Sequence, residues 1–431
     1  MPFETAAGAP RRIAVIGAGI SGLGAAYFLG TDHRVTLFEA EPRLGGHART
    51  VMAGRNGDQP VDTGFIVFNY VNYPHMTRLF RELDVPIAES DMSFGASLNG
   101  GAFEYGLRDL KSVFAQPSNA FSPKFLGMLR DVMKFNANAL KVARDPAMTI
   151  GEFLAALGTG DWFRDRYLLP LSGAIWSTPT QGILDFPAQA MIRFFENHAL
   201  LSHKGQHQWH TVQGGSVEYV RRLEQALLGR GVAIRTGTPV DAVRRGADGV
   251  EVKAKGGAWE QFDEVVFATH SDDTLALLAD PTPEEAAALG AVRYQPNTAV
   301  LHADTAIMPK RRAAWASWVY TEDHGKDSDR IDLTYWMNSL QPIPEADPMF
   351  VTLNSQRPIR EYLIYDTATF RHPVYDLNAL NAQAVLRDMN GAKRTWFCGA
   401  WMKNGFHEDG LSSAVDVVEA MKRRQSETVA A

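Results

Sequence analysis

The fold of this chain is decided near its N-terminus by the stretch RIAVIGAGISG, residues 12–22. Its apolar half, Arg12–Ile16, predicts a buried strand, and its glycine-rich half opens a helix over Ile20–Leu29. A second strand follows over Arg34–Glu39. The start of the chain therefore predicts a βαβ unit and, with it, a parallel sheet.

The glycine-rich half has the pattern G-x-G-x-x-G, which is informative only between a strand and a helix, as it is here. Gly17 allows a tight turn, Gly19 lets the backbone approach a pyrophosphate, and Gly22 lets the helix pack closely on the strand. Free N–H groups at the start of the helix favour phosphate groups. The carboxylate of Glu39 can accept hydrogen bonds from both ribose hydroxyls and would repel a 2′-phosphate. The pattern predicts a bound dinucleotide other than NADP.

Length and composition predict a globular chain of two or three domains. Its 431 residues are 45% apolar, and the net charge of −6 gives no reason to expect a nucleic-acid partner. The single cysteine, Cys398, excludes an intrachain disulfide and a multi-cysteine metal site. No stretch approaches about 18 uncharged apolar residues, and the start lacks the pattern of a signal peptide. We expect a cytoplasmic protein, with peripheral contact to the inner face of the cytoplasmic membrane left open.

Two further segments resemble the FAD-binding motifs of the superfamily of amine oxidases, phytoene desaturases and protoporphyrinogen oxidases. Residues 43–50, RLGGHART, are similar to R-x-G-G-R-x-x-S/T, with His47 where arginine is usual. Residues 397–414 are similar to the C-terminal flavin motif, in which the start of a helix stabilises negative charge on the reduced flavin. The resemblance implies noncovalent FAD, because Cys398 lies in a buried strand and not at the position of a covalent flavin link.

The glycine pattern and the resemblance together imply a set of cofactor-binding residues. They are Gly17, Ala18, Gly19, Ile20, Ser21, Gly22, Glu39, Ala40, Arg43, Gly45, Gly46, His47, Gly64, Phe65, Val240, Ala268, Thr269, Gly399, Asp409, Gly410, Leu411 and Ser412.

The same motifs give the expected fold class and domain organisation. The class is α/β, with a Rossmann-like FAD-binding domain of the amine oxidase and phytoene desaturase type interleaved with an α+β substrate domain. We expect the FAD-binding domain to comprise residues 1–70, 208–290 and 385–431, and the substrate domain residues 71–207 and 291–384. The middle of the chain, residues 107–201, predicts a mostly helical region that could face a membrane.

Other strings, including DTGFIVFN at residues 62–69 and GFHEDGL at residues 405–411, resemble one bacterial family of NAD/FAD-binding, amine-oxidase-like proteins. Its members are often encoded beside methyltransferases similar to cyclopropane-fatty-acid synthase. The resemblance implies an enzyme that desaturates a methylated unsaturated fatty acyl chain, carried in a phospholipid, on the route to furan fatty acids. An allylic position would lose a hydride and a proton to give a conjugated methylated diene. Molecular oxygen is the electron acceptor that the superfamily implies.

Such a substrate needs an apolar tunnel, and the middle of the chain offers large apolar side chains for one, although an ordinary core would use the same residues. They are Phe153, Phe163, Leu168, Leu169, Trp176, Phe186, Phe194 and Phe195. Within this region the segment Arg108–Arg144 has seven basic and two acidic residues, a net charge of 7 − 2 = +5, interleaved with phenylalanine, leucine and methionine. This pattern fits an anionic membrane surface and equally a solvated helix packed on the core.

The candidate catalytic residues flank the flavin motifs. They are Glu408, His372, Tyr375, His407 and Asn338. A base for proton removal should be a histidine or a carboxylate with a pKa near neutrality, so Glu408 and His372 are the predicted bases. His203, His207 and His210 have spacings of four and three, but Gly205 interrupts any helix there, so no metal site is predicted.

Three other functions stay open from the sequence. One is oxidation of a small amine or polyamine, which would use an aromatic cage beside the flavin. Another is desaturation of a carotenoid or a porphyrinogen, which also uses an apolar tunnel. The last is a non-catalytic, FAD-containing lipid-binding partner of another enzyme.

Overall fold

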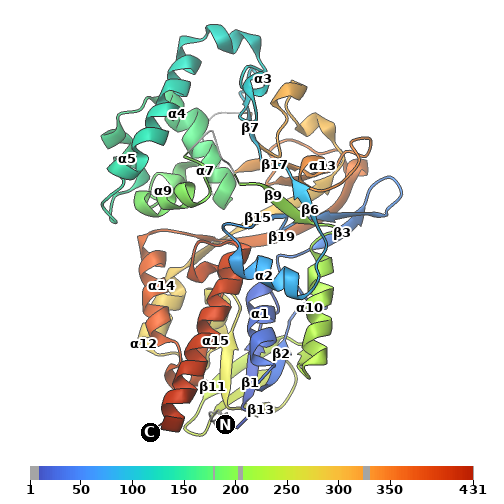
Figure 1. The fold of residues 1–431 in the computed structure, drawn as a ribbon, viewed down its shortest axis with the longest axis vertical. Helices are drawn as coiled ribbons and strands as arrows, with labels where there is room; N and C mark the ends of the chain where they lie inside the picture. The colour runs from blue at the N-terminus through green and yellow to red at the C-terminus, as the bar shows by residue number, and fades with distance from the viewer. Residues whose placement is uncertain (1–8, 178–179, 202–206, 324–330, 431) are drawn as a thin grey trace, which may run out of the picture.

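The computed structural model describes residues 9–177, 180–201, 207–323 and 331–430. The chain forms two halves, one built on a parallel sheet near both termini and one built on a larger sheet with a helical cap at the far end (Figure 1).

The first half is organised around a five-stranded parallel sheet in the order β10-β2-β1-β14-β20. Its strands are β1 (Arg12–Ile16), β2 (Arg34–Phe38), β10 (Ala233–Arg235), β14 (Glu264–Phe267) and β20 (Thr395–Phe397). Alternate residues of β1 face opposite sides and both sides are apolar, as expected for a sheet covered on both faces. Ile13 packs with α1, α10 and α15, whereas Ala14 packs with α12, α14 and a small antiparallel sheet.

The helices of this half follow the glycine turns and the crossover connections. They are α1 (Ile20–Leu29), α2 (Pro74–Glu82), α10 (Val217–Gly229), α11 (Ser271–Leu277), α12 (Pro283–Ala291), α14 (Leu377–Met389) and α15 (His407–Ala430). The predicted domain boundary at residue 385 falls inside α14, whose apolar side chains share the core of Phe397. The last helix begins at His407, and Gly410 in its first turn lies against Ile20 and Ser21 of α1.

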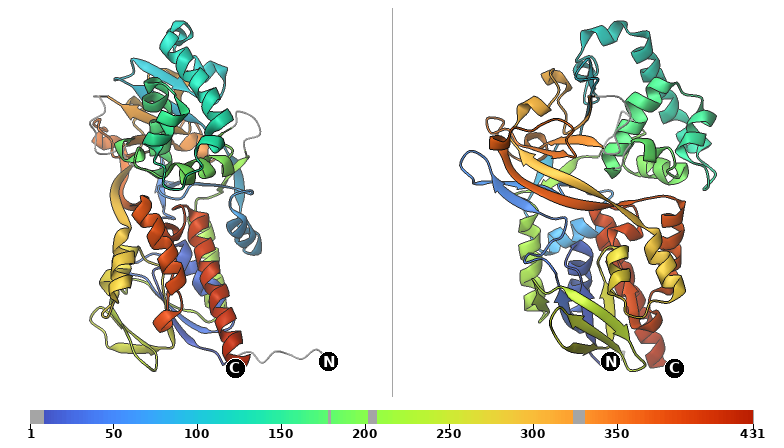
Figure 2. Two further views of the ribbon diagram at one scale, coloured as in Figure 1. Left: turned by 90° about the vertical axis from the view of Figure 1, so that its left-hand side faces the viewer. Right: turned by 180° about the vertical axis from the view of Figure 1, so that it is seen from behind.

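Three smaller sheets join the halves or flank them. They are β3 (Thr50–Ala53) with β4 (Gln59–Asp62), β5 (Val67–Asn69) and β6 (Ile87–Ser90) on either side of β9 (Trp209–Val212), and β11 (Val240–Arg245) with β12 (Val250–Ala254) and β13 (Trp259–Phe262). The views from the side and from behind show the long strands of the second half crossing above the parallel sheet (Figure 2).

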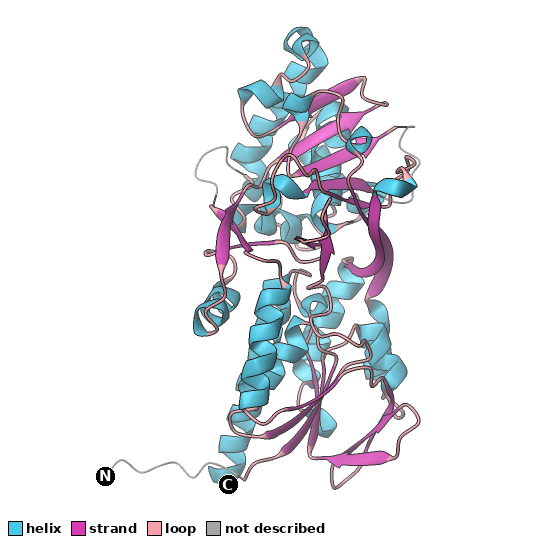
Figure 3. Cartoon of the chain, turned by 90° about the vertical axis from the view of Figure 1, so that its right-hand side faces the viewer, coloured by secondary structure: helices cyan, strands magenta, loops and turns pink. Residues whose placement is uncertain are grey.

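The second half is organised around a seven-stranded mixed sheet in the order β19-β15-β18-β17-β16-β7-β8. Its strands are β7 (Phe94–Leu98), β8 (Phe103–Gly106), β15 (Arg293–His302), β16 (Trp318–Glu322), β17 (Asp332–Trp336), β18 (Phe350–Leu353) and β19 (Ile364–Val374). The sequence did not predict β19, which contains Pro373; a proline is tolerated there because β19 is an edge strand. Figure 3 shows strands of this sheet beside the helices of the cap, with the parallel sheet at the other end of the molecule.

The cap is helical, as the sequence predicted. Its elements are α3 (Leu110–Val113), η1 (Pro117–Phe121), α4 (Pro123–Val142), α5 (Ile150–Leu157), α6 (Asp161–Phe163), η2 (Arg164–Leu168), α7 (Leu169–Trp176), α8 (Thr180–Ile183) and α9 (Ala188–Asn197). The element η2 is a π-helical turn, a distortion that often accompanies functional sites. Within the described parts of the chain, no helix is both long and apolar enough to cross a membrane.

Candidate functional site

Two glycine loops lie backbone against backbone at the start of α1. Gly17 has a φ of +96° and donates its N–H to the carbonyl of Phe38 at 2.8 Å. Gly45 donates to the carbonyl of Ala18 at 2.9 Å, and a Cβ on Gly46 would lie 3.0 Å from Cα of Gly19. A Cβ on Gly19 would meet nothing within 4 Å, so the space over the start of α1 is open. An open space lined by backbone at a helix N-terminus fits a pyrophosphate.

The helices α1 and α15 meet at their starts because glycine removes the side chains that would separate them. A Cβ on Gly22 would lie 1.7 Å from the carbonyl oxygen of Gly17, and one on Gly410 would lie 2.8 Å from the side chain of Ile20. Leu411 is fully buried, and a Cβ on Gly24 of α1 would lie 2.5 Å from its side chain. The positive ends of two helix dipoles therefore lie next to each other, which favours an anionic cofactor.

The end of β2 is arranged to bind a ribose. One carboxylate oxygen of Glu39 accepts the N–H of Ala18 at 2.6 Å, and the other accepts the N–H of Glu41 at 2.8 Å. Each oxygen keeps further acceptor capacity for a hydroxyl group. The turn before β11 lies beside this carboxylate, since Thr238 donates its N–H to the carbonyl of Glu39 at 2.8 Å. This turn brings Val240 next to the expected adenosine site, and Ala40 is exposed on the same edge.

Arg43 supports the second glycine loop. Its guanidinium donates to the carbonyl of Gly46 at 2.9 Å and to that of Ala48 at 3.3 Å. These bonds fix the loop that carries His47. The side chain therefore stabilises the loop and does not point away from it toward a phosphate.

Gly64 and the end of β14 lie against the two glycine loops. A Cβ on Gly64 would lie 2.0 Å from the carbonyl oxygen of His47, so only glycine fits there, and Phe65 donates its N–H to the same oxygen at 2.9 Å. Ala268 donates its N–H to the carbonyl of Ile16 at 2.8 Å, which places the end of β14 beside the first glycine loop.

The C-terminal motif is tied together by Ser413. Gly399 donates its N–H to the hydroxyl of Ser413 at 2.9 Å, and this hydroxyl donates to the carbonyl of Gly410 at 2.8 Å. Ser412 accepts a hydrogen bond from Lys403. Cys398 is fully buried, and burial raises the pKa of its thiol to about 12.

Three imidazoles from different parts of the chain gather where the loops meet β19. His47 lies 5.6 Å from His372 and 6.1 Å from His270 between ring centroids, and 5.0 Å from Phe370. Burial lowers the pKa of His47 to about 4 and those of His372 and His270 to about 3. All three keep part of their surface accessible despite lying inside the fold. They therefore border accessible space and are uncharged at neutral pH.

The orientation of His372 is set by two buried asparagines. Thr298 donates its backbone N–H to the side-chain oxygen of Asn354 at 2.9 Å, and Asn354 donates its amide to the oxygen of Asn297 at 2.7 Å. Asn297 then donates to Nδ1 of His372 at 2.8 Å. Because the chain starts at a backbone donor, its direction is fixed. Nδ1 of His372 is the acceptor, and the neutral ring carries its hydrogen on Nε2.

His407 lies between the flavin motif and the cap. Its ring stacks on Phe65 with a centroid distance of 4.0 Å, and its Nε2 is 2.6 Å from the hydroxyl of Tyr219. Burial lowers the pKa of His407 to about 3. The preceding residue, Phe406, stacks on Phe194 of α9 at 4.8 Å. This segment therefore links the expected flavin site to the aromatic core of the cap.

Glu408 and Asp409 hold helix starts. The two oxygens of Glu408 accept the N–H groups of His75 and Met76, each at 2.9 Å, in the first turn of α2. Asp409, in the first turn of α15, accepts the N–H of Phe406, the residue before the helix, at 2.9 Å. Burial raises the pKa of Glu408 to about 7 and that of Asp409 to about 6. Capping uses both oxygens of Glu408, which argues against its predicted role as the base.

The last two predicted catalytic residues lie in different environments. Tyr375 is buried with its ring 6.3 Å from Phe186, and burial raises the pKa of its hydroxyl. The side chain of Asn338 is hydrogen-bonded within a loop. It donates to the carbonyls of Pro344 and Asp347 and accepts the N–H of Met349, all at 2.8 Å. The structure does not connect Asn338 to the imidazoles by any described contact.

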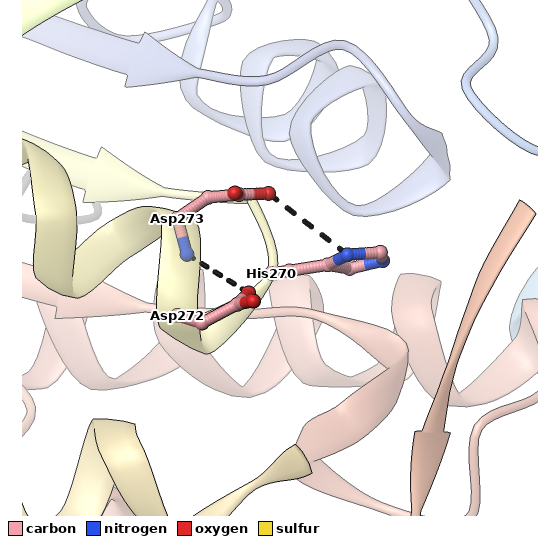
Figure 4. Close-up of side chains that lie close together, drawn as sticks. All are labelled: His270, Asp272 and Asp273. Atoms are coloured by element: carbon pink, nitrogen blue, oxygen red, sulfur yellow. Dashed lines mark hydrogen bonds and ion pairs between the residues drawn. The ribbon is translucent and has the colours of Figure 1, made fainter. Parts of the chain in front are cut away.

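One group of potential metal ligands faces the imidazoles. His270, Asp272 and Asp273 point toward one another (Figure 4), with ligand atoms within 4.8 Å. Arg371 pairs with both carboxylates, at 2.8 Å to Asp272, and lies 3.1 Å from Nδ1 of His270. A guanidinium already supplies the positive charge of this group. His203, for which no metal role was predicted, lies outside the described residues.

The geometry of these residues fits FAD. The open space over Gly19, the converging helix starts and the carboxylate of Glu39 accommodate a dinucleotide, and the partly accessible imidazoles continue the space toward the cap. The sequence missed His270, Asn297, Asn354, Tyr219 and Phe370 as parts of the site. Only His270 carried a signal, since it directly follows Ala268 and Thr269, which were predicted to bind the cofactor.

Comparison with known proteins supports this assignment. The sequence model of the flavin containing amine oxidoreductases matches residues 20–340. A stretch of 47 residues is 53% identical to an L-amino-acid oxidase of Sistrurus catenatus edwardsii, covering 11% of this chain and 9% of that enzyme. Another of 78 residues is 45% identical to a coproporphyrinogen III oxidase of Mycobacterium tuberculosis (strain ATCC 25618 / H37Rv), covering 17% of this chain and 16% of that enzyme. These curated matches span less than a fifth of either enzyme.

Solved structures match over almost the whole chain. A CLA-producing fatty acid isomerase from P. acnes superposes with a TM-score of 0.68 at 14% identity, covering 95% of this chain and 98% of the isomerase. A cyclohexylamine oxidase from Brevibacterium oxydans IH-35A gives 0.66 at 15% identity, covering 96% and 100%. The predicted fold class, an amine-oxidase-type FAD-binding fold of mixed α/β content, is confirmed.

Proposed function

The chain belongs to the flavin-containing amine oxidoreductases, a family of FAD-dependent oxidoreductases, and from this premise we propose that it desaturates a methylated unsaturated fatty acyl chain. The product would be a conjugated methylated diene, and the substrate a phospholipid that carries the acyl chain. The observation that carries the proposal is a continuous aromatic core that runs from the cap to Phe406, next to His407 and the expected flavin.

This core connects side chain to side chain. Phe135 of α4 lies 5.4 Å from Phe163 and 6.0 Å from Phe195. Phe195 stacks with Trp176, and Trp176 lies 4.9 Å from Phe194. Phe194 then stacks on Phe406, next to His407. A binding site lined by such side chains would favour an acyl chain by the hydrophobic effect, whereas a polar or charged substrate would lose its hydration there.

The imidazoles of the site are also uncharged. His47, His372 and His407 are uncharged because burial lowers the pKa of each to between about 3 and 4. Among the described residues, the carboxylates of Asp272 and Asp273 are paired with Arg371, and Glu408 caps α2. Uncharged imidazoles beside an apolar core favour an acyl chain over a charged polyamine.

Within this site the chain's own residues have separate roles. His372 presents the N–H of Nε2 and acts as a hydrogen-bond donor, which argues against its predicted role as the base. His407 is the proposed proton acceptor: when its Nε2 donates to Tyr219, Nδ1 keeps a free lone pair. Its low pKa leaves the ring unprotonated and ready to accept, although it lowers the basicity. Bound noncovalently, FAD would supply the hydride acceptor, and molecular oxygen would take the two electrons together with two protons to give hydrogen peroxide.

The comparisons support an acyl substrate at the level of the fold. The solved fatty acid isomerase shows that a protein named for a fatty acid uses this architecture. The cyclohexylamine oxidase and the coproporphyrinogen III oxidase keep an amine and a porphyrinogen as competing substrate classes. The aromatic core favours the acyl chain over the amine, and the choice between the acyl chain and the porphyrinogen rests on the substrate test.

Anaerobic flavin bleaching tests the proposal. The FAD-loaded protein is mixed in separate stopped-flow experiments with a methylated unsaturated acyl phospholipid, putrescine, cyclohexylamine, a carotenoid and coproporphyrinogen. We expect the methylated lipid to reduce the flavin and the product to absorb as a conjugated diene. Bleaching by an amine, the carotenoid or the porphyrinogen alone would replace the proposal with that activity. No bleaching by any of them would leave a non-catalytic lipid-binding role.

The role of His407 is tested with His407→Phe, which keeps an aromatic ring against Phe65 and removes both nitrogens. We expect flavin reduction by the lipid to slow by roughly 100-fold or more, the usual range for loss of a general base. Retention of bound FAD serves as the control for folding. An unchanged rate would remove His407 from the mechanism and leave the substrate assignment intact.

A further inference from the structure

The helix α4 is apolar on two opposite sides. Its inner side packs into the cap through Phe125, Met128 and Phe135, which are all buried. Its outer side exposes Leu126 by 45%, Met133 by 72% and Leu140 by 44%. The spacing of these outer residues, 126, 133 and 140, keeps them on one stripe along the helix. The outer stripe has no described partner in the chain.

Two more apolar side chains are exposed just before α4. Leu110 of α3 is 78% exposed, and Phe121 at the end of η1 is 87% exposed. A phenylalanine exposed to this extent is costly to hydrate, so its burial against an apolar partner is favourable. The outer face of α3, η1 and α4, which we name the cap face, therefore carries Leu110, Phe121, Leu126, Met133 and Leu140.

Basic residues surround these apolar groups. They are Arg108, Lys111, Lys124, Arg130, Lys134, Lys141 and Arg144, all exposed. Among the residues that the structure describes, Lys111, Lys141 and Arg144 have no contact with a carboxylate.

The two acidic residues of this segment are engaged in capping. Asp109 accepts the N–H of Ser112 at 2.7 Å and caps α3. Asp131 is buried and accepts the N–H of Gly160 at 2.9 Å at the start of α6. The outward charge of the cap face is therefore strongly positive, while the rest of the chain carries −6 − 5 = −11.

We propose that the cap face docks on an anionic lipid bilayer. Exposed apolar side chains that insert among acyl chains, ringed by cations that pair with lipid phosphates, are what an interfacial helix presents to a membrane. A second copy of the chain is a poorer occupant, because two cap faces would bring like charges together. The negative charge of the rest of the chain would also orient the molecule with this face toward an anionic surface.

The position of the face supports this orientation. The cap face lies at the end of the molecule opposite both termini (Figures 1 and 2). The inner side of the same helix, at Phe135, begins the aromatic core that reaches Phe406. Docking would thus place the bilayer at the end of the aromatic core that is far from Phe406. The docking inference rests on exposure and charge and stands without the proposed reaction.

Vesicle flotation with the full-length, FAD-loaded protein tests the proposal. The probes are vesicles of phosphatidylglycerol mixed with phosphatidylcholine and vesicles of phosphatidylcholine alone, each at low and high salt. We expect binding to the anionic vesicles at low salt and release as salt rises, because charge attraction is screened. Absence of binding to the anionic vesicles at low salt would overturn the proposal.

Two variants locate the contact. The apolar variant is Phe121→Ser with Met133→Ser, and the charge variant is Arg130→Gln with Lys141→Gln. We expect the charge variant to bind roughly fivefold more weakly for each cation removed, and the apolar variant to lose binding even at low salt. The matched control, Leu228→Ser with Tyr362→Ser, removes side chains that are 50% and 77% exposed elsewhere, and should bind normally.

The controls separate this inference from the proposed function. Flavin reduction by a detergent-dispersed substrate should be the same in both variants and in the wild-type protein. If both variants bind vesicles as the wild type does, the cap face is not the contact. If light scattering shows a dimer that the apolar variant converts to a monomer, the face is an interface between copies and the lipid assignment is wrong.

Discussion

Asn297 donates its side-chain amide to Nδ1 of His372 at 2.8 Å, and this one bond decides which nitrogen of the ring carries hydrogen. The donor cannot flip, because Asn354 donates to its oxygen and is itself held by the backbone N–H of Thr298. The neutral His372 is thereby a donor at Nε2, on a strand that faces the imidazoles of the other half. His372, which the sequence suggested as a base, is thus arranged to donate a hydrogen bond.

Asn297→Asp should reverse the role of His372. A carboxylate accepts the hydrogen of Nδ1, so the ring would present a lone pair at Nε2, and the added negative charge would raise the pKa of His372 above its present value of about 3. We expect flavin reduction by substrate to slow at least tenfold, and nitrogen NMR to show the tautomer change.

His372→Gln provides the comparison for Asn297→Asp. Glutamine keeps an N–H donor, so it should retain more of the rate than Asn297→Asp does. Bound FAD and the unfolding midpoint report whether each variant is folded. If Asn297→Asp changes the tautomer but not the rate, donation by His372 is not needed for the reaction.

Gly46→Ala should weaken FAD binding. Gly46 has a φ of +56°, and a Cβ there would press against Cα of Gly19 at 3.0 Å, which is backbone and cannot rotate away. The loops would separate where the pyrophosphate is expected. We predict a dissociation constant for FAD at least tenfold higher, about 1.4 kcal/mol, measured by fluorescence titration of the apoprotein.

The control for Gly46→Ala is Gly57→Ala. Gly57 has a similar φ of +69°, but a Cβ on it would meet nothing within 4 Å. Both variants carry the same kind of backbone strain, roughly 1–2 kcal/mol, and only the first disturbs the loop contact. Equal effects on FAD binding would show that strain alone, and not the approach of the loops, explains the loss.

The two halves of the site differ in how far the sequence could predict them. The loops at Gly17, Gly46 and Gly64 were predictable because backbone geometry demands glycine at fixed spacing, and such a demand leaves a local pattern. The bond between Asn297 and His372 joins neighbouring strands, residues 75 positions apart, and follows from strand register. No local pattern records that register. The sequence likewise could not show that the carboxylate of Glu408 turns toward α2, because that contact spans 333 positions.

Glu408→Ala should destabilise the protein without slowing flavin reduction. The substitution leaves the N–H groups of His75 and Met76 without acceptors, and loss of such capping costs about 0.5–2 kcal/mol. We expect a lower midpoint of denaturant unfolding at pH 6. Because burial raises the pKa of Glu408 to about 7, its ionisation opposes folding, and the loss of stability should shrink as the pH rises past 7. Glu408→Gln keeps one acceptor oxygen and should lie between. A reduction rate that falls in Glu408→Gln while its stability holds would restore Glu408 as the base.

The buried His302 should make folding stability depend on pH. Its Nε2 lies 2.7 Å from the hydroxyl of Thr352, and burial lowers its pKa to about 4 from an ordinary value of 6.5. Between these values the unfolded chain binds a proton that the folded chain does not. Stability is therefore complete above pH 6.5 and is lost as the pH falls toward 4, at about 1.4 kcal/mol per pH unit.

His302→Gln isolates this contribution, because glutamine can still accept the N–H of Asp304 and donate to Thr352 but does not titrate. We measure the free energy of unfolding by denaturant titration between pH 4.5 and 6.5. We expect its slope against pH to fall by the contribution of one proton, about 1.4 kcal/mol per pH unit. Thr352→Val keeps the imidazole buried and should keep the wild-type slope while lowering stability at every pH. If the slope is the same in His302→Gln as in the wild type, the imidazole is protonated in the fold and its burial does not govern its pKa.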